Sequence, residues 1–317
     1  MHKAPGKSDR KGISLVELMD MFPNDETAKE WFESKIWPEG PHCPHCGSLN
    51  VQTGTAHKSM THRCRDCPNK PRFSLKTGTI LESTKLDYRT WALAVYMLIT
   101  NLKGVSSMKL HRDLKITQKS AWHLMHRLRK AFDTSGLECF LGPIEVDETY
   151  IGGKRKNMPK AKRKALTGRG AVGKIAVVGI KDRATNRLMA RVVAHTDAET
   201  LQGFVGDHAA PDAKVYTDDA SAYQGLPFDH ESVKHSAGEY VRGMAHINGI
   251  ESFWSMLKRG YQGTFHHFSD KHTQRYVTEF AGRHNIREQD TVDQMATLAR
   301  GLGGRRLRYS DLVSDCG

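Results

Sequence analysis

The sequence contains no hydrophobic run long enough to cross a membrane. Its most apolar stretch, WALAVYMLIT at residues 91–100, is about half the ~20 residues that a membrane-spanning helix requires. The basic segment 1–12 leads into an amphipathic stretch without a small-residue cleavage site, so we expect no secretion signal. These absences predict a cytoplasmic protein that has no membrane partner.

Acidic residues are scarce relative to basic ones. The 317 residues include 48 Lys and Arg against 35 Asp and Glu, which gives a formal net charge of +13. Residues 51–135 hold 16 basic and 5 acidic residues, so this block alone accounts for +11. Because a basic surface attracts polyanions, we expect a nucleic-acid-binding segment here. The chain shows no internal repeat and no clear coiled-coil seam.

Cysteines are few, but four of the six form two C-x₂-C pairs. Each pair can close a tight knuckle that presents two thiolates, and two knuckles complete a tetrahedral Zn²⁺ site. A cytosolic chain does not normally keep disulfides, which disfavours that alternative. The segment 73–81, FSLKTGTIL, alternates like further strands of a zinc ribbon. The predicted zinc ligands are Cys43, Cys46, Cys64 and Cys67, and the remaining Cys139 and Cys316 are isolated.

Helical patterns surround this cysteine region. Residues 13–34 predict two short helices broken at Pro23, and residues 88–100 have helical apolar spacing. A helix over 108–116, a short turn and a basic helix over 117–132 follow the order of a helix-turn-helix, although an ordinary basic helical hairpin has the same order. The candidate DNA contacts on the last helix are Lys119, His123, Arg127 and Lys130.

The second half of the chain alternates between strand and helix patterns. A basic loop, with eight Lys and Arg in 17 residues, follows its first strand. Three strands, a helix, two strands and a helix is the element order of an RNase H-like fold. The predicted elements are strands 143–153, 174–180 and 187–195, a helix over 196–210 that begins with the capping pattern T-x-x-E, strands 214–219 and 231–236, and a helix from 246.

Carboxylates recur at defined positions of these elements. Period-two alternation places Glu145 and Asp147 on one face of the first strand. If strand 214–219 pairs with it in parallel, Asp218 or Asp219 converges on Asp147. Helical spacing in the last helix predicts a buried apolar stripe of Ile247, Ile250, Trp254, Leu257 and Tyr261, beside a polar stripe of Asn248, Glu251, Ser255 and Lys258. Clustered carboxylates raise their pKa values or bind cations, and oxygen ligands suit Mg²⁺ or Mn²⁺. The pattern predicts metal-assisted phosphoryl transfer.

Several motifs carry a resemblance to a known family. They are CPHC, CRDC and FSLKTGTIL, then IEVDETYIGGK, VYTDDASAY and the segment that begins HINGIESFWSMLKRGYQGTFHH. Over roughly residues 20–290 the chain resembles the DDE transposases of bacterial insertion sequences, in the ISXO2-like group with an N-terminal zinc ribbon. The resemblance implies the triad Asp147, Asp218 and Glu251, with Lys258 two helical turns after Glu251 to contact a DNA phosphate.

Some assignments within this motif stay open. Asp219 is an alternative to Asp218, and Asn248 either assists the metal site or caps the helix. Further along, the aromatic residues after the helix either pack the following helix or belong to a DNA-contacting surface. The candidate DNA contacts in this part of the chain are Lys258, Arg259, His266 and His267.

The resemblance implies an α+β multidomain protein that recognises the terminal inverted repeats of an insertion sequence. It would cleave a DNA strand at the metal site and transfer the free 3′ end to target DNA, as a homodimer or higher oligomer. The alternatives are a zinc-ribbon DNA-binding regulator with an inactive second half, and a nuclease without strand transfer. The expected segments are 1–38, helical; 39–82, zinc ribbon; 83–137, helix-turn-helix-like; 138–290, RNase H-like; and 291–317, a C-terminal tail.

Overall fold

The protein divides into two compact units, Met1–Asp133 with Ile286–Gly317, and Thr134–Asn285. The computed structural model describes residues 10–69, 71–133, 139–153, 155–166, 171–233 and 246–314. The zinc-ribbon segment, the helices before and after it, and the C-terminal tail therefore share the first unit. Within these described ranges, no helix combines the length and the apolar character that a membrane span requires.

The helices of the first unit between residues 13 and 133 follow the sequence predictions closely. They are α1 (Leu15–Met21), α2 (Asp25–Ile36), α3 (Tyr88–Thr100), α4 (Ser107–Leu114) and α5 (Gln118–Ala131). Asn24 caps α2 by accepting a hydrogen bond from the Thr27 N–H at 2.9 Å, and Thr117 caps α5 through the Ser120 N–H at 3.1 Å. Three residues connect α4 to α5. The predicted helix, short turn and second helix are thus present.

The zinc-ribbon segment forms a small antiparallel sheet. Its strands are β1 (Val51–Gln52), β2 (His62–Cys64) and β3 (Arg72–Phe73), in that order. The prediction of further strand over 73–81 was wrong beyond Phe73. The chain turns there because the Thr77 N–H donates to the Ser74 carbonyl and Gly78 takes a positive φ of 69°.

The C-terminal tail is helical and completes the core of the first unit. It contains α10 (Thr291–Arg300) and α11 (Tyr309–Val313). Leu298, Leu302 and Leu312 are buried in the same hydrophobic cluster as Trp91 of α3 and Leu128 of α5. The tail is therefore a structural part of this unit.

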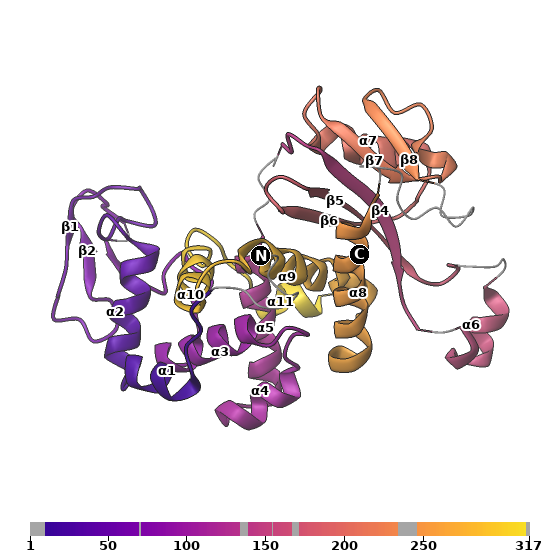
Figure 1. Cartoon of the computed structure of the whole chain (residues 1–317). Helices are drawn as coiled ribbons and strands as arrows, with labels where there is room; N and C mark the ends of the chain where they lie inside the picture. Colours follow the sequence, from indigo (N-terminus) through magenta and orange to yellow (C-terminus); the bar gives the residue numbers. More distant parts are fainter. Residues whose placement is uncertain are drawn as a thin grey trace. The chain divides into compact units, whose positions relative to one another are not determined.

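The second unit is built around a mixed five-stranded sheet. Its strands are β4 (Ile144–Ile151), β5 (Ile175–Asp182), β6 (Leu188–Val193), β7 (Lys214–Asp218) and β8 (Asp229–Val233), in the order β6-β5-β4-β7-β8. The β4, β5 and β6 strands pair antiparallel, whereas β7 runs parallel to both β4 and β8. The strands expected over 174–180 and 187–195 thus form a hairpin, and the parallel pairing on which the convergence of the aspartates depended is present. Figure 1 shows this sheet beside α7 and α8.

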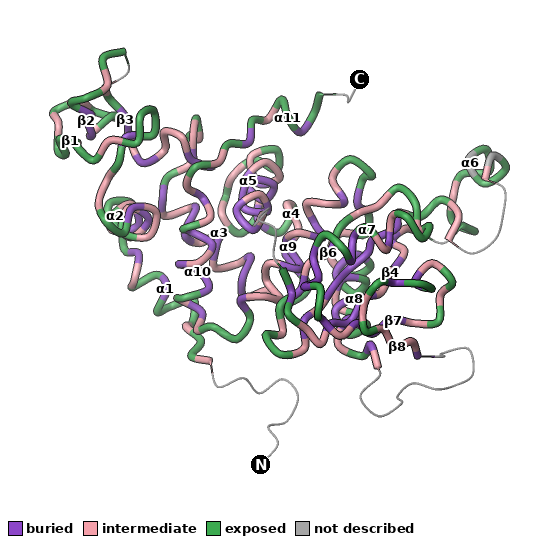
Figure 2. The backbone as a smooth tube through the Cα atoms, turned by 90° about the horizontal axis from the view of Figure 1, so that it is seen from above, coloured by how far each residue is buried: buried purple, intermediate pink, exposed green. Residues whose placement is uncertain are grey.

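Helices cover both faces of the sheet. The face with Val146 packs against α7 (Ala198–His208), and the face with Tyr216 packs against α8 (Asn248–Gly260). Figure 2 shows the buried positions gathered along these strands and helices. The cap of α7 differs from the prediction: Asp197, not Thr196, accepts the Thr200 N–H at 2.9 Å, because the helix begins one residue later than T-x-x-E requires.

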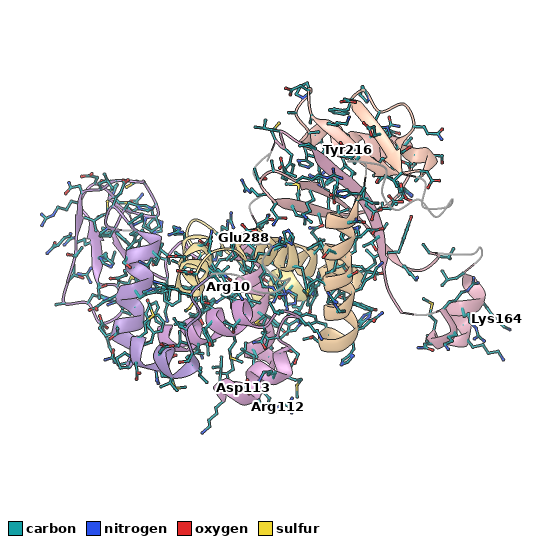
Figure 3. The ribbon with its side chains drawn as sticks, in the orientation of Figure 1. Arg10, Arg112, Asp113, Lys164, Tyr216 and Glu288 are labelled. Atoms are coloured by element: carbon teal, nitrogen blue, oxygen red, sulfur yellow. The ribbon has the colours of Figure 1, made fainter. Side chains whose placement is uncertain are left out.

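The edge strand β6 is protected by α9 (Thr273–Ile286). Gln274 accepts the Val192 N–H at 2.7 Å, and Asn285 both accepts the Leu188 N–H and donates to the Leu188 carbonyl, each at 2.8 Å. Unpaired strand edges invite association with other chains, so these side chains satisfy backbone groups that would otherwise be available. Between β4 and β5 the chain carries the short basic helix α6 (Lys160–Ala165), on which Lys164 is exposed (Figure 3).

Candidate active site and zinc site

The predicted carboxylates meet where β4 and β7 run side by side. The parallel register pairs Ile144 with Val215 and Glu145 with Tyr216. Continuing this register by two residues brings Asp147 level with Asp218. Both lie on the face covered by α8, because alternate residues of a strand share a face and Tyr216 belongs to the cluster that includes α8.

Asp147 sits in a largely buried position that disfavours its charge. Burial raises the pKa of Asp147 to about 8, and the negative charges of Asp218 and Glu148 add to this. The Trp254 indole donates from Nε1 to Asp147 Oδ2 at 3.0 Å, which partly offsets the shift. An indole is a neutral donor, so this hydrogen bond orients the carboxylate without cancelling its charge.

Glu148 faces the opposite side of the sheet. Burial raises the pKa of Glu148, while a hydrogen bond from the Tyr223 hydroxyl at 2.9 Å lowers it. Tyr223 lies in a short 3₁₀ helix (Ser221–Tyr223) and is fully buried with α7. This carboxylate therefore belongs to the α7 side, as alternation predicted.

Glu145 anchors the start of α8. Its side chain is only 2% exposed, and its carboxylate accepts hydrogen bonds from Arg183 Nε and from the Ile250 N–H, both at 2.8 Å. No side chain of α8 itself caps this end. A carboxylate at a helix N-terminus satisfies an otherwise open N–H and interacts favourably with the helix dipole. Arg183 extends the anchor by donating to the His246 carbonyl.

Two glycines allow α8 to approach the sheet closely. Gly179 of β5 pairs with Asp147, and a Cβ there would lie 2.8 Å from the Trp254 ring. A Cβ on Gly249 would lie 2.7 Å from Glu145 Oε2. Ile250 and Trp254, one helical turn apart, thus bind Glu145 and Asp147, two residues apart on the strand.

Glu251 follows directly after the anchored Ile250. The predicted stripes of α8 are confirmed: Ile247, Ile250, Trp254, Leu257 and Tyr261 are buried, while Asn248, Glu251, Ser255 and Lys258 are exposed. Asn248 begins the helix and does not cap it. In the part of the chain that the structure describes, three potential metal ligands lie within 4.8 Å of one another only at a cysteine cluster, so Asp147, Asp218 and Glu251 do not reach that spacing as a set.

The two aspartates of the β7 doublet differ in position. Asp218 ends the strand, is partly buried, and accepts the Ala220 N–H at 3.1 Å. Asp219 follows the strand and is exposed. Of these two aspartates, only Asp218 contributes to the raised pKa of Asp147. This geometry favours Asp218 over Asp219 as the partner of Asp147.

The cysteine cluster fits a structural zinc ion. The sulfur atoms of Cys43, Cys46 and Cys67 lie within 4.8 Å of one another, and Cys64 Sγ is 3.6 Å from Cys46 Sγ. With Zn–S bonds of about 2.3 Å, the sulfurs of a tetrahedral site stand about 3.8 Å apart. All four are free thiols, so the disfavoured disulfide alternative is not realised.

The predicted DNA contacts differ in exposure. Lys119, Lys258, Arg259, His266 and His267 are exposed, whereas His123 and Lys130 are partly buried. Arg127 is 7% exposed and donates to the carbonyls of Leu307 and Glu82 at 3.2 and 2.8 Å. Its side chain thus supports the fold of the first unit, which makes Arg127 the least suited of these residues to reach DNA.

The aromatic residues beyond α8 pack together. Phe268 stacks on Tyr276 of α9 with ring centroids 4.1 Å apart, and Phe265 lies 4.9 Å from the same ring. These rings therefore pack the following helix, which is the first of the two alternatives for this segment. The neighbouring His266 and His267 remain exposed and available.

Three positions that shape the site were not among the predicted site residues. Glu145 carried a signal, since it shares a face with Asp147, but only the fold shows that it binds α8. Trp254 was predicted as a core residue, and its indole N–H requires a buried partner that the sequence does not identify. Gly179 had no local signal, because its role depends on the helix that crosses it.

The described residues thus define a protein with a cysteine-rich, zinc-ribbon unit and a mixed sheet whose adjoining strands carry carboxylates. A family model for the ISXO2-like transposase domain matches residues 140–285, and one for a transposase zinc-ribbon domain matches residues 23–70. Both matches coincide with the features just described.

Two curated proteins are similar to the chain. Over 252 residues it is 30% identical to an uncharacterized protein in transposable element ISH50 of Halobacterium salinarum, which covers 75% of this chain and 83% of the relative. Over 114 residues it is 32% identical to an uncharacterized transposase-like protein of Haemophilus influenzae, which covers 35% of this chain and 91% of that relative. The chain belongs to the ISXO2-like transposase family.

Proposed function

We propose that this protein is a DDE transposase that binds the terminal inverted repeats of its insertion sequence, cleaves a DNA strand and transfers the free end to target DNA. The observation that carries the proposal is the parallel pairing of β4 with β7, which brings Asp147 level with Asp218 under a helix that carries Glu251. Strand order β6-β5-β4-β7-β8 supports an RNase H-like fold for this unit.

The donor set of this site fits Mg²⁺ or Mn²⁺. Asp147, Asp218 and Glu251 offer only oxygen ligands, which these ions prefer, and the mutual repulsion of Asp147 and Asp218 is relieved by a cation. When bound, such ions activate the attacking oxygen and stabilise the leaving oxygen of a phosphodiester.

The residues of the chain position the reacting groups. Glu145 and Trp254 fix α8 on the sheet, so that Glu251 is held in the turn between two anchored positions. Lys258 lies two turns further along the exposed stripe of α8, where its ammonium group can contact a phosphate of the bound DNA end. Both strand cleavage and strand transfer are displacements at phosphorus, so one site serves both.

DNA recognition is assigned to the first unit. Its zinc ribbon and its α4–turn–α5 segment fall largely in the block that carries most of the excess positive charge. We propose that this unit holds the terminal repeat in the manner of a helix-turn-helix, and that two transposase molecules bring the two ends together.

The test is metal-dependent cleavage of a duplex taken from the element's ends, with Asp147→Ala, Asp218→Ala and Glu251→Ala beside the parent. Asp219→Ala is the matched control. We expect cleavage to be lost in the first three and kept in the control, with DNA binding unchanged in all. If the parent binds DNA without cleaving it, a regulator is favoured. If the parent cleaves DNA without transferring the strand, a nuclease is favoured. Cleavage by Asp147→Ala would refute the assigned site.

A further inference from the structure

A cavity of about 540 Å³ lies beside the first turns of α5 in the N-terminal unit. Its wall combines parts of the chain that are far apart in sequence. Lys119 and Arg127 come from α5, Arg306 and Arg308 come from the C-terminal segment 305–309, and Glu82 comes from the loop before α3. The volume is in the range of about 300–1,000 Å³ found for ligand pockets.

The cavity is strongly basic. Four cationic side chains and one carboxylate line it, which leaves a charge of +3. Burial lowers the pKa of His123, another lining residue, and the nearby Arg127 charge adds to this, so its ring contributes no charge at neutral pH. The single acid, Glu82, pairs with Arg306 at 2.9 Å and orients it, while a guanidinium keeps further donors for a ligand.

The wall formed by the C-terminal segment is firmly attached. Leu307 is 4% exposed, and its carbonyl accepts the Arg127 Nε–H at 3.2 Å. Arg305 donates to the Lys130 and Ala131 carbonyls at the end of α5, both at 3.1 Å. Lys119 of α5 also contacts this segment, because its Nζ lies 4.3 Å from the Tyr309 ring centroid. The segment that carries Arg306 and Arg308 is therefore held against α5, the helix that carries Lys119, and all three cationic side chains are exposed.

We propose that this cavity binds a phosphate of the DNA backbone, with Lys119, Arg306 and Arg308 as its ligands. The inference rests on the proposed function, in which this unit holds DNA, and adds the C-terminal segment to the binding surface. The side chains of His123 and Arg127 contact the Leu307 carbonyl, so these two residues of α5 are not free to read base edges. The cavity is therefore better suited to a phosphate than to a base. Backbone contacts position the protein without reading sequence.

The test measures the affinity of the full-length, zinc-loaded protein for two duplexes, one from the element's end and one unrelated, over a range of salt concentrations. The variants are Arg306→Gln/Arg308→Gln and, separately, Lys119→Gln, which leaves the hydrogen bonds of the C-terminal segment intact. Arg300→Gln is the matched control, since Arg300 is exposed on α10 of the same unit and does not line the cavity.

Loss of the one phosphate contact should reduce the magnitude of the slope of log affinity against log salt by about 0.9, which is the largest change expected in either the double variant or Lys119→Gln. We expect Lys119→Gln to weaken both duplexes by the same factor, because the contact carries no sequence information, and Arg300→Gln to leave the slope unchanged.

While the parent still binds DNA, two outcomes would refute phosphate binding in this cavity. One is a salt dependence in both Lys119→Gln and the double variant equal to that of the control. The other is weakened binding of the end duplex alone. If a loss of helix signal shows that the double variant is unfolded, the result for Lys119→Gln alone tests the proposal. Failure of the parent to bind either duplex would overturn the proposed function, and this inference with it.

Discussion

Replacement of Glu145 should loosen the start of α8 without touching a predicted catalytic residue. Glu145→Ala leaves the Ile250 N–H without its acceptor and Arg183 without its carboxylate, each formerly at 2.8 Å. Breaking one side of a buried ion pair costs about 3–5 kcal/mol, and an unsatisfied buried donor about 1–3 kcal/mol.

The loss at this site should fall below the range for a buried ion pair. Arg183 is 13% exposed, still donates to the His246 carbonyl, and keeps its guanidinium carbon 4.1 Å from the Tyr216 ring centroid. Tyr216 is labelled in Figure 3, on the sheet. We therefore expect the free energy of opening the first turn of α8 to fall by about 2–3 kcal/mol, which corresponds to roughly 30- to 150-fold faster amide exchange.

The assay is hydrogen exchange followed by mass spectrometry on peptides that cover residues 247–260. Glu148→Ala is the control, because it removes the same side chain from the same strand but on the face of Tyr223 and α7. Protection of this turn should fall only in Glu145→Ala, and cleavage of DNA should fall with it. Unchanged protection in Glu145→Ala, or an equal loss in both variants, would refute the anchoring role.

Three further predictions follow from neighbouring contacts. Because the folded pKa of Asp147, about 8, exceeds its ordinary value, the folded state binds more protons and the parent loses stability as pH rises from about 4 to about 8. Without added divalent cation, Asp147→Asn should therefore raise the free energy of unfolding, measured by urea denaturation, by up to a few kcal/mol at pH 9 and not near pH 4. Gly179→Ala should destabilise the protein by about 1–3 kcal/mol in the same assay by pushing on the indole of α8, whereas Gly206→Ala, with open space around its Cβ, should not. Cys64→Ser should lower the bound zinc measured by atomic emission, and Cys139→Ser, at an exposed thiol outside the cluster, should keep one zinc per chain.

Local patterns were sufficient for most elements of the fold. The apolar stripe of α8 and the alternation along β4 are periodic signals, and each placed its side chains on the faces that the structure shows. The caps at Asn24 and Thr117 are also local features, because capping depends on the next three residues only. The parallel pairing of β4 with β7 was a condition of the predicted carboxylate site, and the structure meets it.

Contacts between distant segments could not be read in this way. The strand expected over 73–81 fails at a turn, where Gly78 takes a positive φ that the alternating pattern does not reveal. The return of Leu307 to α5, 180 residues earlier in the chain, has no periodic signature at either end. Alternation likewise placed Glu145 on the face of Asp147, but only the packing of α8 against the sheet shows that Glu145 anchors this helix.

The distribution of compensating partners separates the carboxylates of this site by role. Glu145 faces a cation and a helix N-terminus, so its charge is balanced within the protein. Asp147 is oriented by a neutral indole, Asp218 accepts a backbone N–H, and the two charges repel each other across adjoining strands. Negative charge is therefore concentrated where β4 and β7 adjoin, beneath the helix that carries Glu251. A divalent cation held there would be drawn by Asp147 and Asp218, whereas Glu145 would already be neutralised, so removal of Glu145 should weaken metal-dependent cleavage through the position of α8 and leave the number of carboxylate ligands unchanged.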